Sequence, residues 1–192
     1  LFDERRFLRP MGGRIFKTLP LETYRGCPFK CTFCNSPMQI TFSKENELGN
    51  FLRRKKINEI RKILKDLISK HKPDYIYILD DSFLSRPRRE ILDFVDMYSE
   101  FNIPFWFNTR PESCDAEILS SLKEVGLDRI SVGLEHGNYN FRSKVLLRKP
   151  TNEKLLHHLD LIADSGIAFS INTIIGFPEE TREMVFETIK FC

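Results

Sequence analysis

Apolar residues recur along this chain in two alternating patterns, short β-rich runs and longer stretches with helical spacing. The runs predict strands of modest length at Lys17–Arg25, Asp74–Leu79, Pro104–Asn108, Arg129–Leu134 and Ala168–Ile175. After each run, apolar residues three or four positions apart predict a helix, the first from about Ile57 and the last from about Met184. This alternation predicts an α/β fold with right-handed crossovers and a parallel sheet, either open or curled into a barrel.

One predicted connection is much longer than the others. About twenty residues separate Cys34 from the helix near Ile57, whereas a crossover loop usually has only a few residues. A long loop inside a compact domain is usually functional, and this one begins inside a cluster of cysteines. The basic run Arg53–Lys56 near its end is interpreted as a solvated helix start, with contact to a phosphate or substrate as the alternative.

Composition narrows the class of protein. The 192 residues suffice for one domain, and a net charge of only +3 gives no strong signal for nucleic-acid or membrane binding. No apolar run approaches the length of a membrane span, and the N-terminus does not resemble a signal peptide. Five cysteines without an export signal indicate thiol chemistry in a reducing compartment, so we expect a cytoplasmic protein. Leu1 and the uncapped end at Cys192 predict that residues 1–192 form one domain of a longer chain, incomplete at its C-terminal end.

Polar, thiol or glycine residues follow every predicted strand. In chain order they are Cys27 to Cys34, Asp80-Asp81-Ser82, Asn108-Thr109-Arg110, Glu135-His136-Gly137 and Gly176-Phe177-Pro178-Glu179. In parallel α/β sheets the reactive site lies beyond the carboxyl ends of the strands. The sequence therefore predicts a single site at that rim.

The triplet Cys27, Cys31 and Cys34 is the most specific chemical signal. A structural zinc site requires four ligands, and no fourth ligand lies nearby in the sequence. Ferredoxin-type runs have a different spacing and normally use four thiolates. Three thiolates on a four-iron cluster leave one iron open to a non-protein ligand, as a reactive cluster requires. A zinc site or a group of core thiols is the alternative interpretation.

The CxxxCxxC spacing, with Phe33 just before the third cysteine, resembles the signature of radical S-adenosylmethionine (radical SAM) enzymes. The resemblance covers nearly the whole chain and implies a partial (β/α) barrel with about five of the family's six strand–helix units. It also implies a [4Fe–4S] cluster on Cys27, Cys31 and Cys34. The open iron of that cluster would bind S-adenosylmethionine, which is cleaved to methionine and a 5′-deoxyadenosyl radical.

The resemblance assigns further residues to the cofactor. Phe33 would lie beside the adenine, and Asp80 and Asp81 stand where many members carry a Gly-Gly-Glu motif for the methionine ammonium. Arg110 would pair with the methionine carboxylate and Glu135 with the ribose hydroxyls. The stretch Asn172 to Glu179, which contains Gly176, resembles the GxIxGxxE motif on the adenine side, with Asn in place of the first Gly. Turn capping by Asp80 and Asp81 and a surface ion pair at Arg110 are the alternatives.

Residues 131–188 and the sequence DDSF at 80–83 resemble the class of radical SAM proteins that is associated with a cobalamin-binding domain. This implies methyl transfer, rearrangement or similar chemistry on a small molecule or biosynthetic intermediate, with an electron donor such as flavodoxin or ferredoxin. Cobalamin would be bound by a domain outside this chain. A methylthiotransferase is the alternative enzyme. A non-catalytic iron–sulfur or zinc module is the alternative of a different class, and it would not need polar residues at five strand ends.

Overall fold

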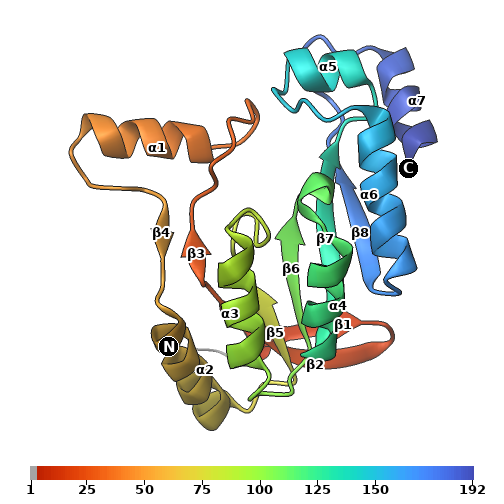
Figure 1. Cartoon of the computed structure of the whole chain (residues 1–192). Coiled ribbons are helices and arrows are strands. Elements are labelled where there is room, and N and C mark those ends of the chain that lie inside the picture. The colour runs from red at the N-terminus through yellow and green to blue at the C-terminus, as the bar shows by residue number, and fades with distance from the viewer. Residues whose placement is uncertain (1–3) are drawn as a thin grey trace.

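The computed structural model describes residues 4–192 and shows a curved sheet with helices on its convex side (Figure 1). The strand order is β1-β2-β5-β6-β7-β8. The strands are β1 (Leu8–Met11), β2 (Arg14–Leu21), β5 (Tyr75–Ile78), β6 (Phe105–Thr109), β7 (Leu127–Glu135) and β8 (Ala168–Thr173). Strand β1 pairs antiparallel with β2, and the strands from β2 to β8 pair in parallel. The partial barrel with five parallel strand–helix units is confirmed.

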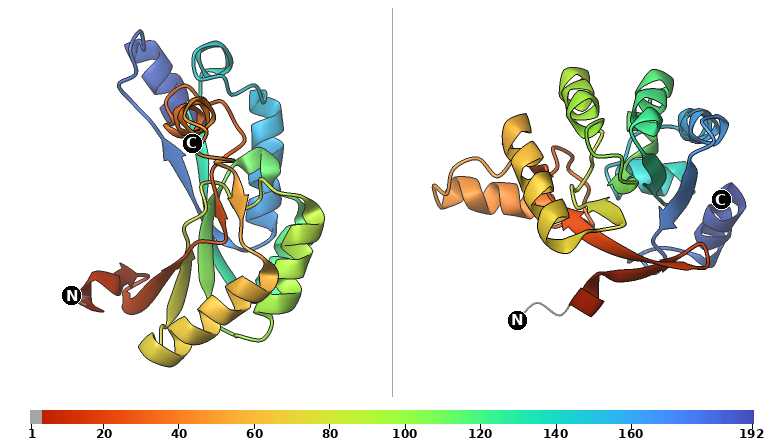
Figure 2. Two further views of the ribbon diagram at one scale, coloured as in Figure 1. Left: turned by 90° about the vertical axis from the view of Figure 1, so that its left-hand side faces the viewer. Right: turned by 90° about the horizontal axis from the view of Figure 1, so that it is seen from below.

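Four long helices cover the convex side of the sheet, as the view from below shows (Figure 2). They are α2 (Ile57–His71), α3 (Arg88–Tyr98), α4 (Ala116–Glu124) and α6 (Asn152–Asp164), and α7 (Arg182–Phe191) follows β8. Each contains apolar residues at the spacing that predicted it, because one stripe of each helix must be removed from water. Gly126, with φ of 109°, and Gly166, with φ of 66°, follow α4 and α6 as left-handed C-terminal residues.

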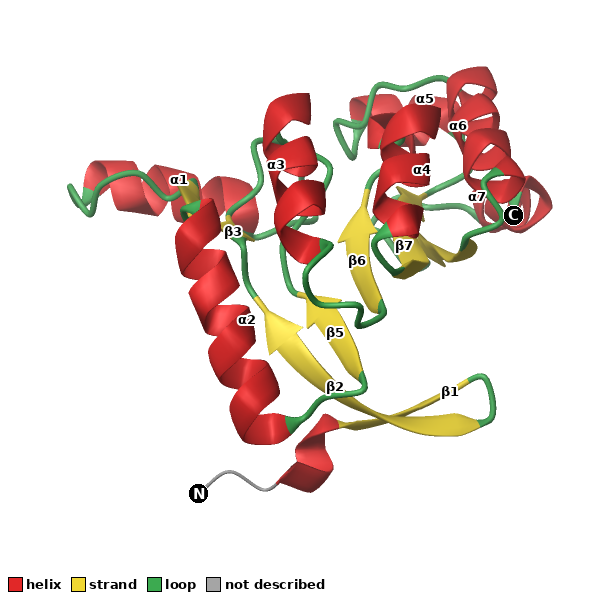
Figure 3. Ribbon diagram, turned by 60° about the horizontal axis from the view of Figure 1, so that its bottom comes forward, coloured by secondary structure: helices red, strands yellow, loops and turns green. Residues whose placement is uncertain are grey.

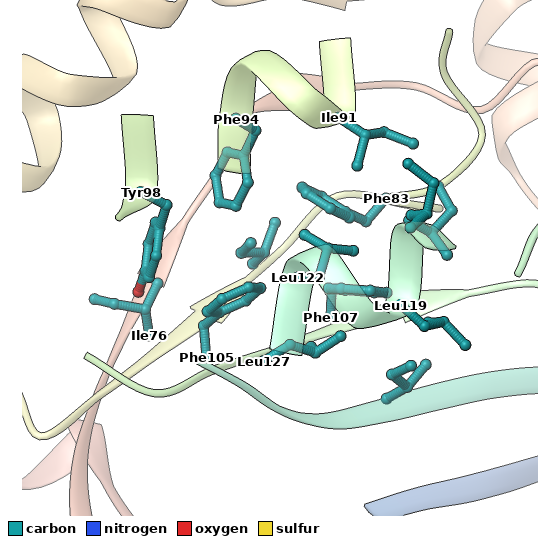
Figure 4. Packing of buried hydrophobic residues seen from close by; sticks show 14 of the residues in the cluster. Ile76, Phe83, Ile91, Phe94, Tyr98, Phe105, Phe107, Leu119, Leu122 and Leu127 are labelled. Atoms are coloured by element: carbon teal, nitrogen blue, oxygen red, sulfur yellow. The ribbon is translucent and has the colours of Figure 1, made fainter. Parts of the chain in front are cut away.

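The hydrophobic core lies between the sheet and these helices. Phe105 and Phe107 of β6 point into it and meet Phe83, Phe94 and Tyr98, whose rings contact one another (Figure 4). Alternate residues of the parallel strands face this core, so the residues between them face the concave side of the sheet. The concave side is therefore where polar strand residues such as Asn108 and Ser131 are placed.

The long connection after Cys34 was predicted as a loop, and this prediction was wrong. It contains helix α1 (Ser36–Glu45) and strand β4 (Arg53–Arg54), which pairs antiparallel with β3 (Tyr24–Arg25). Among the residues of α1 only Ser36 is buried, so the helix has no continuous apolar stripe that its sequence could reveal. The run Arg53–Lys56 is solvated, but its first two residues form β4 rather than the start of α2.

Two further elements were not expected. The hairpin of β1 and β2 turns at Gly12-Gly13 and extends beyond the amino end of β5 (Figure 3). Helix α5 (Tyr139–Lys144) lies between β7 and α6 and has too few residues to show a helical period. The first predicted strand, Lys17–Arg25, is split into β2 and β3. No helix in residues 4–192 is both long and apolar enough to cross a bilayer.

Candidate active site

The loop of residues 27–34 is here called the cysteine loop. Together with the carboxyl ends of β5, β6, β7 and β8 it encloses a cavity of about 310 Å³, here called the upper cavity. Most of the residues predicted from the sequence line it: Cys27, Cys31, Phe33, Cys34, Asp81, Arg110 and Glu135. Asp80 and Gly176 do not line it. Residues that lie far apart in the sequence therefore converge at the rim where parallel strands place their functional side chains.

Short-range hydrogen bonds shape the cysteine loop. The backbone N–H of Cys27 donates to Ser36 Oγ at 3.1 Å, and the N–H of Ser36 donates to Cys34 Sγ at 3.4 Å. The N–H of Cys34 donates to the carbonyl of Cys31 at 3.2 Å. Gly26 enters the loop with φ of 90°, and a Cβ there would lie 2.8 Å from the Leu52 side chain. The loop is thus closed by the start of α1, and only glycine fits at its entry.

The three thiols of this loop are free and partly buried. Burial raises the pKa of the Cys27 and Cys31 thiols, and the charge of Arg110 acts in the opposite direction on both. Metal ligands must be deprotonated, so binding of a cationic centre here would release protons. Among residues 4–192, no three side chains of Cys, His, Asp or Glu converge on one ion. Three free thiols on one loop are a donor set that suits an iron–sulfur centre, whose protein ligands are thiolates.

Charged side chains form a partly buried network beside the thiols. Arg148, which is 2% exposed, donates to Glu135 Oε1 at 3.0 Å and to Glu112 Oε2 at 3.2 Å. Glu112 also pairs with Arg110 at 2.6 Å, and the Arg110 guanidinium lies 3.7 Å from the centre of the Phe29 ring. Burial raises the pKa of Glu135, and Arg148 and Arg110 oppose that rise. Buried charges need partners, and these residues are paired with one another.

Arg148 and Glu112 were missed in the sequence. Glu112 lies in a short 3-10 turn after β6, and Arg148 follows α5 on an irregular segment. Neither position has a periodic pattern around it, so no local signal marks them. The position of Arg148, 13 residues after Glu135, becomes meaningful only when α5 folds back over the strand end.

A backbone irregularity in β7 directs Glu135 into the cavity. The register between β7 and β8 shifts between Gly133 and Glu135, and Glu135 has φ of 71°. A Cβ on Gly133 would collide with the Glu135 carboxylate. Bulges next to active sites commonly redirect one side chain in this way. The absence of a side chain at Gly133 leaves room for the carboxylate that the bulge redirects.

Asp80 and Asp81 have different surroundings. Asp80 is 1% exposed and accepts hydrogen bonds from the backbone N–H groups of Thr23 and Tyr24 at 2.8 and 3.0 Å. It also accepts from the Thr23 hydroxyl and pairs with Arg86. These bonds fasten the chain just before the cysteine loop and leave Asp80 outside the upper cavity. Asp81 lines that cavity, and burial followed by the charge of Asp80 raises its pKa.

A second cavity of about 350 Å³ lies on the other side of Phe33, against residues 145 and 146, which follow α5, and the loop after β8. Phe33 and Phe177 meet edge to face with ring centres 6.1 Å apart. Gly176 lines neither cavity, but it has φ of 95° and its N–H donates to the Glu180 carboxylate. Glu180 also accepts from Phe177 N–H at 3.2 Å and bonds His136 Nε2 at 3.0 Å. Thus Glu180, rather than the exposed Glu179, holds this loop.

Comparisons with known proteins agree with this geometry. A family model described as the radical SAM superfamily matches residues 21–192. An uncharacterised methyltransferase of Pyrococcus horikoshii is 27% identical over 88% of this chain and 35% of its own length. The ribosomal protein uS12 methylthiotransferase of Thermotoga maritima is 27% identical over 86% of this chain and 38% of its own.

Solved structures have a fold similar to that of this chain. The cobalamin-dependent S-adenosylmethionine radical enzyme OxsB, solved with aqua-cobalamin bound, superposes with a TM-score of 0.72 at 22% identity. The match covers 90% of this chain and 26% of that one. This likeness shows a shared fold. The chain spans little more than a third of the length of the two curated relatives above.

Proposed function

Because this chain belongs to the radical SAM superfamily, whose members use a [4Fe–4S] cluster and S-adenosylmethionine, we propose that Cys27, Cys31 and Cys34 hold such a cluster. The protein would use it to cleave S-adenosylmethionine reductively. One observation carries the proposal: three free thiols and the charged groups of Asp81, Arg110 and Glu135 line the same cavity. A structural metal module would need the thiols but not the charged groups.

The donor set suits the cluster. The thiols lie on one loop and take part in no disulfide. When bound, the cluster supplies the electron that splits S-adenosylmethionine into methionine and a 5′-deoxyadenosyl radical. The incomplete protein coordination would leave one iron for the amino and carboxylate groups of that molecule.

The remaining residues bind and orient S-adenosylmethionine. Asp81 offers a carboxylate to the methionine ammonium, and Arg110 offers a guanidinium to the methionine carboxylate. Glu135 accepts hydrogen bonds from the ribose hydroxyls, and Arg148 holds it in place. The cavity beside Phe33 receives the adenine, with the ring of Phe177 forming its other wall.

We further propose that the radical serves methyl transfer, rearrangement or similar chemistry on a small molecule, in the class that pairs this domain with cobalamin. The support is the similarity to the Pyrococcus methyltransferase and to the fold of OxsB. A flavodoxin or ferredoxin would supply the electrons, in the cytoplasm. Methylthiotransfer is the second candidate, and the similarity to the uS12 methylthiotransferase favours it.

Anaerobic reconstitution with iron and sulfide tests the cluster. The wild-type chain should take up about four iron atoms per chain and, with dithionite, convert S-adenosylmethionine to 5′-deoxyadenosine, measured by liquid chromatography. Cys27→Ala, Cys31→Ala and Cys34→Ala should each lose both properties. Cys192→Ser is the matched control, because this exposed thiol lies outside the upper cavity and should be dispensable. Tightly bound zinc without iron uptake would refute the proposal.

Equilibrium binding of S-adenosylmethionine to the reconstituted protein tests the charged residues. Glu135→Gln and Asp81→Asn should each raise Kd roughly tenfold or more, since a lost charge-assisted hydrogen bond costs about 1.5–3 kcal/mol. Iron content should not change. Glu124→Gln is the control, because this exposed carboxylate at the end of α4 lines neither the upper cavity nor the cavity beside Phe33. Wild-type affinity in both test variants would show that the two carboxylates do not bind S-adenosylmethionine and have structural roles.

A further inference from the structure

The concave face of the sheet carries another cavity, here called the lower cavity, of about 250 Å³. It is lined by Thr18 and Pro20 of β2, Tyr77 of β5 and Trp106 of β6, together with Arg6 and Arg9 of the N-terminal segment. Thr18 pairs with Tyr75, the first residue of β5, so the cavity reaches the amino ends of the strands. The cysteine loop lies at the opposite, carboxyl ends.

Buried polar atoms on this face lack hydrogen-bond partners among residues 4–192. They are Thr18 Oγ1, Trp106 Nε1 and Arg129 Nε. Thr18 and Trp106 line the lower cavity, and Arg129 is the register neighbour of Trp106 on β7. Thr18 is only 5% exposed, and each of these atoms has almost no surface that a molecule in the cavity could reach. They make the layer directly beneath the cavity wall polar.

The shape of the lower cavity favours a flat apolar body. The rings of Tyr77 and Trp106 lie 4.2 Å apart between centres with an interplanar angle of 34°, and together they form one wall. The Tyr77 hydroxyl accepts a hydrogen bond from Asn108 Nδ2 at 2.6 Å. Asn108 also lines the upper cavity, so the two cavities adjoin at this hydrogen bond. A molecule bound against the aromatic wall would therefore extend toward the cofactor site.

The charge of the lower cavity favours an anion. Arg6 and Arg9 line it, and none of its described lining residues is acidic. Arg129 adds a third guanidinium on the same face, one strand beyond Trp106. Guanidinium groups pair well with carboxylates because both are planar and can form two parallel hydrogen bonds.

We propose that the lower cavity binds the substrate, and that the substrate is an organic carboxylate with a planar apolar body. The body packs on Tyr77 and Trp106, and the carboxylate lies toward Arg6 and Arg9. This inference rests on the proposed function, because it names the substrate class of that site, but binding itself requires neither S-adenosylmethionine nor a reductant.

Isothermal titration calorimetry of the reconstituted 192-residue chain with 2-naphthoate and with its neutral analogue 2-naphthamide tests the inference. The carboxylate should bind about tenfold more tightly than the amide and should quench the fluorescence of Trp106, the one tryptophan in the sequence. Arg6→Ala/Arg9→Ala should abolish the preference. The control Arg53→Ala/Arg89→Ala removes the same charge from exposed positions outside the lower cavity and should preserve it. Thr18→Val should leave the preference unchanged, since the Thr18 hydroxyl is out of reach of a molecule in the cavity.

The naphthoate experiment and the reconstitution experiment can fail independently of each other. Equal affinity for carboxylate and amide, no binding of either, or an unchanged preference in Arg6→Ala/Arg9→Ala would each overturn the inference, even if 5′-deoxyadenosine still forms. The arginine variants keep the test valid if Thr18→Val fails to fold, since both arginines are exposed. Preferential naphthoate binding by a chain that takes up no iron would support the lower cavity and contradict the cluster proposal alone.

Discussion

Asp80 and Asp81 are adjacent in the sequence but serve different parts of the molecule. Asp80 accepts hydrogen bonds from the backbone of residues 23 and 24 and pairs with Arg86, whereas Asp81 lines the upper cavity. Both follow β5, where successive side chains point in different directions. A carboxylate pair at a strand end can therefore combine a structural role with a binding role, and the loop that it fastens is the one that carries the thiols.

The cysteines differ in environment and should differ in reactivity. Burial raises the pKa of the Cys114 thiol to about 12. Because a raised pKa keeps the thiol protonated below that value, very little reactive thiolate exists at pH 8. In the cluster-free protein, iodoacetamide at pH 8 should modify Cys192 and the cysteine-loop thiols faster than Cys114, because these thiols are more exposed, although burial raises the pKa of Cys27, Cys31 and Cys192 as well. Peptide mass spectrometry measures the rates.

Reconstitution provides the matched comparison for this labelling experiment. Cluster binding should protect Cys27, Cys31 and Cys34 and leave Cys192 reactive. If Cys114 reacted as fast as Cys192 in the folded protein, its burial in the hydrophobic core would be wrong. If iron failed to protect the cysteine loop, the ligand assignment would be wrong.

At the scale of elements, the loop after β8 is shaped by one side chain. Glu180 accepts hydrogen bonds from Gly176 and Phe177 and bonds His136, which follows β7. His136 Nδ1 accepts the N–H of Asn138, so its Nε2 carries the proton that is donated to Glu180. This arrangement joins the ends of two neighbouring strands and sets Phe177 against Phe33.

Removing that side chain should loosen the loop. Glu180→Ala leaves two N–H groups and a buried imidazole without their acceptor, which should lower the free energy of unfolding by about 1–3 kcal/mol. It should also weaken S-adenosylmethionine binding, because Phe177 is no longer held beside Phe33. Urea denaturation and equilibrium binding measure the two effects. Glu124→Ala is the control and should change neither, since Glu124 is exposed and lines neither cavity; equal effects in both variants would contradict the role of Glu180.

At the scale of the whole molecule, the sheet has a stable centre and weaker margins. Strands β5, β6 and β7 are flanked by paired strands on both sides, and their core-facing residues are buried under α3 and α4. Strand β8 is an edge with mostly exposed residues, and α1 lies apart from the helices that cover the sheet (Figure 1). Local opening requires less free energy where few apolar contacts hold the backbone.

Hydrogen–deuterium exchange should follow this order. The amides of β6 and β7 should exchange slowest, by about two orders of magnitude or more relative to α1. Binding of a cluster should slow exchange in residues 27–36, because the start of α1 closes the cysteine loop. Slow exchange throughout α1 in the cluster-free protein would show that this helix is more firmly anchored than its contacts indicate.

The sequence by itself determined the alternation of five strands with helices along the chain, because apolar periodicity reports which face of each element leaves water. It also determined the rim residues, since parallel strands that share a sheet direct their carboxyl ends to the same side. The CxxxCxxC spacing of Cys27, Cys31 and Cys34 indicated the family through its resemblance to the radical SAM signature.

Only the tertiary structure decided which of these residues face the cavity. The separation of Asp80 from Asp81, the bulge that turns Glu135 inward and the pairing of Glu135 with Arg148 depend on contacts between distant segments. Helix α1 and strand β1 gave no signal because few of their residues are buried, and periodicity records burial alone. The lower cavity also could not be predicted from the sequence. Its walls come from the N-terminal segment, β2, β5 and β6, which meet only in the folded protein.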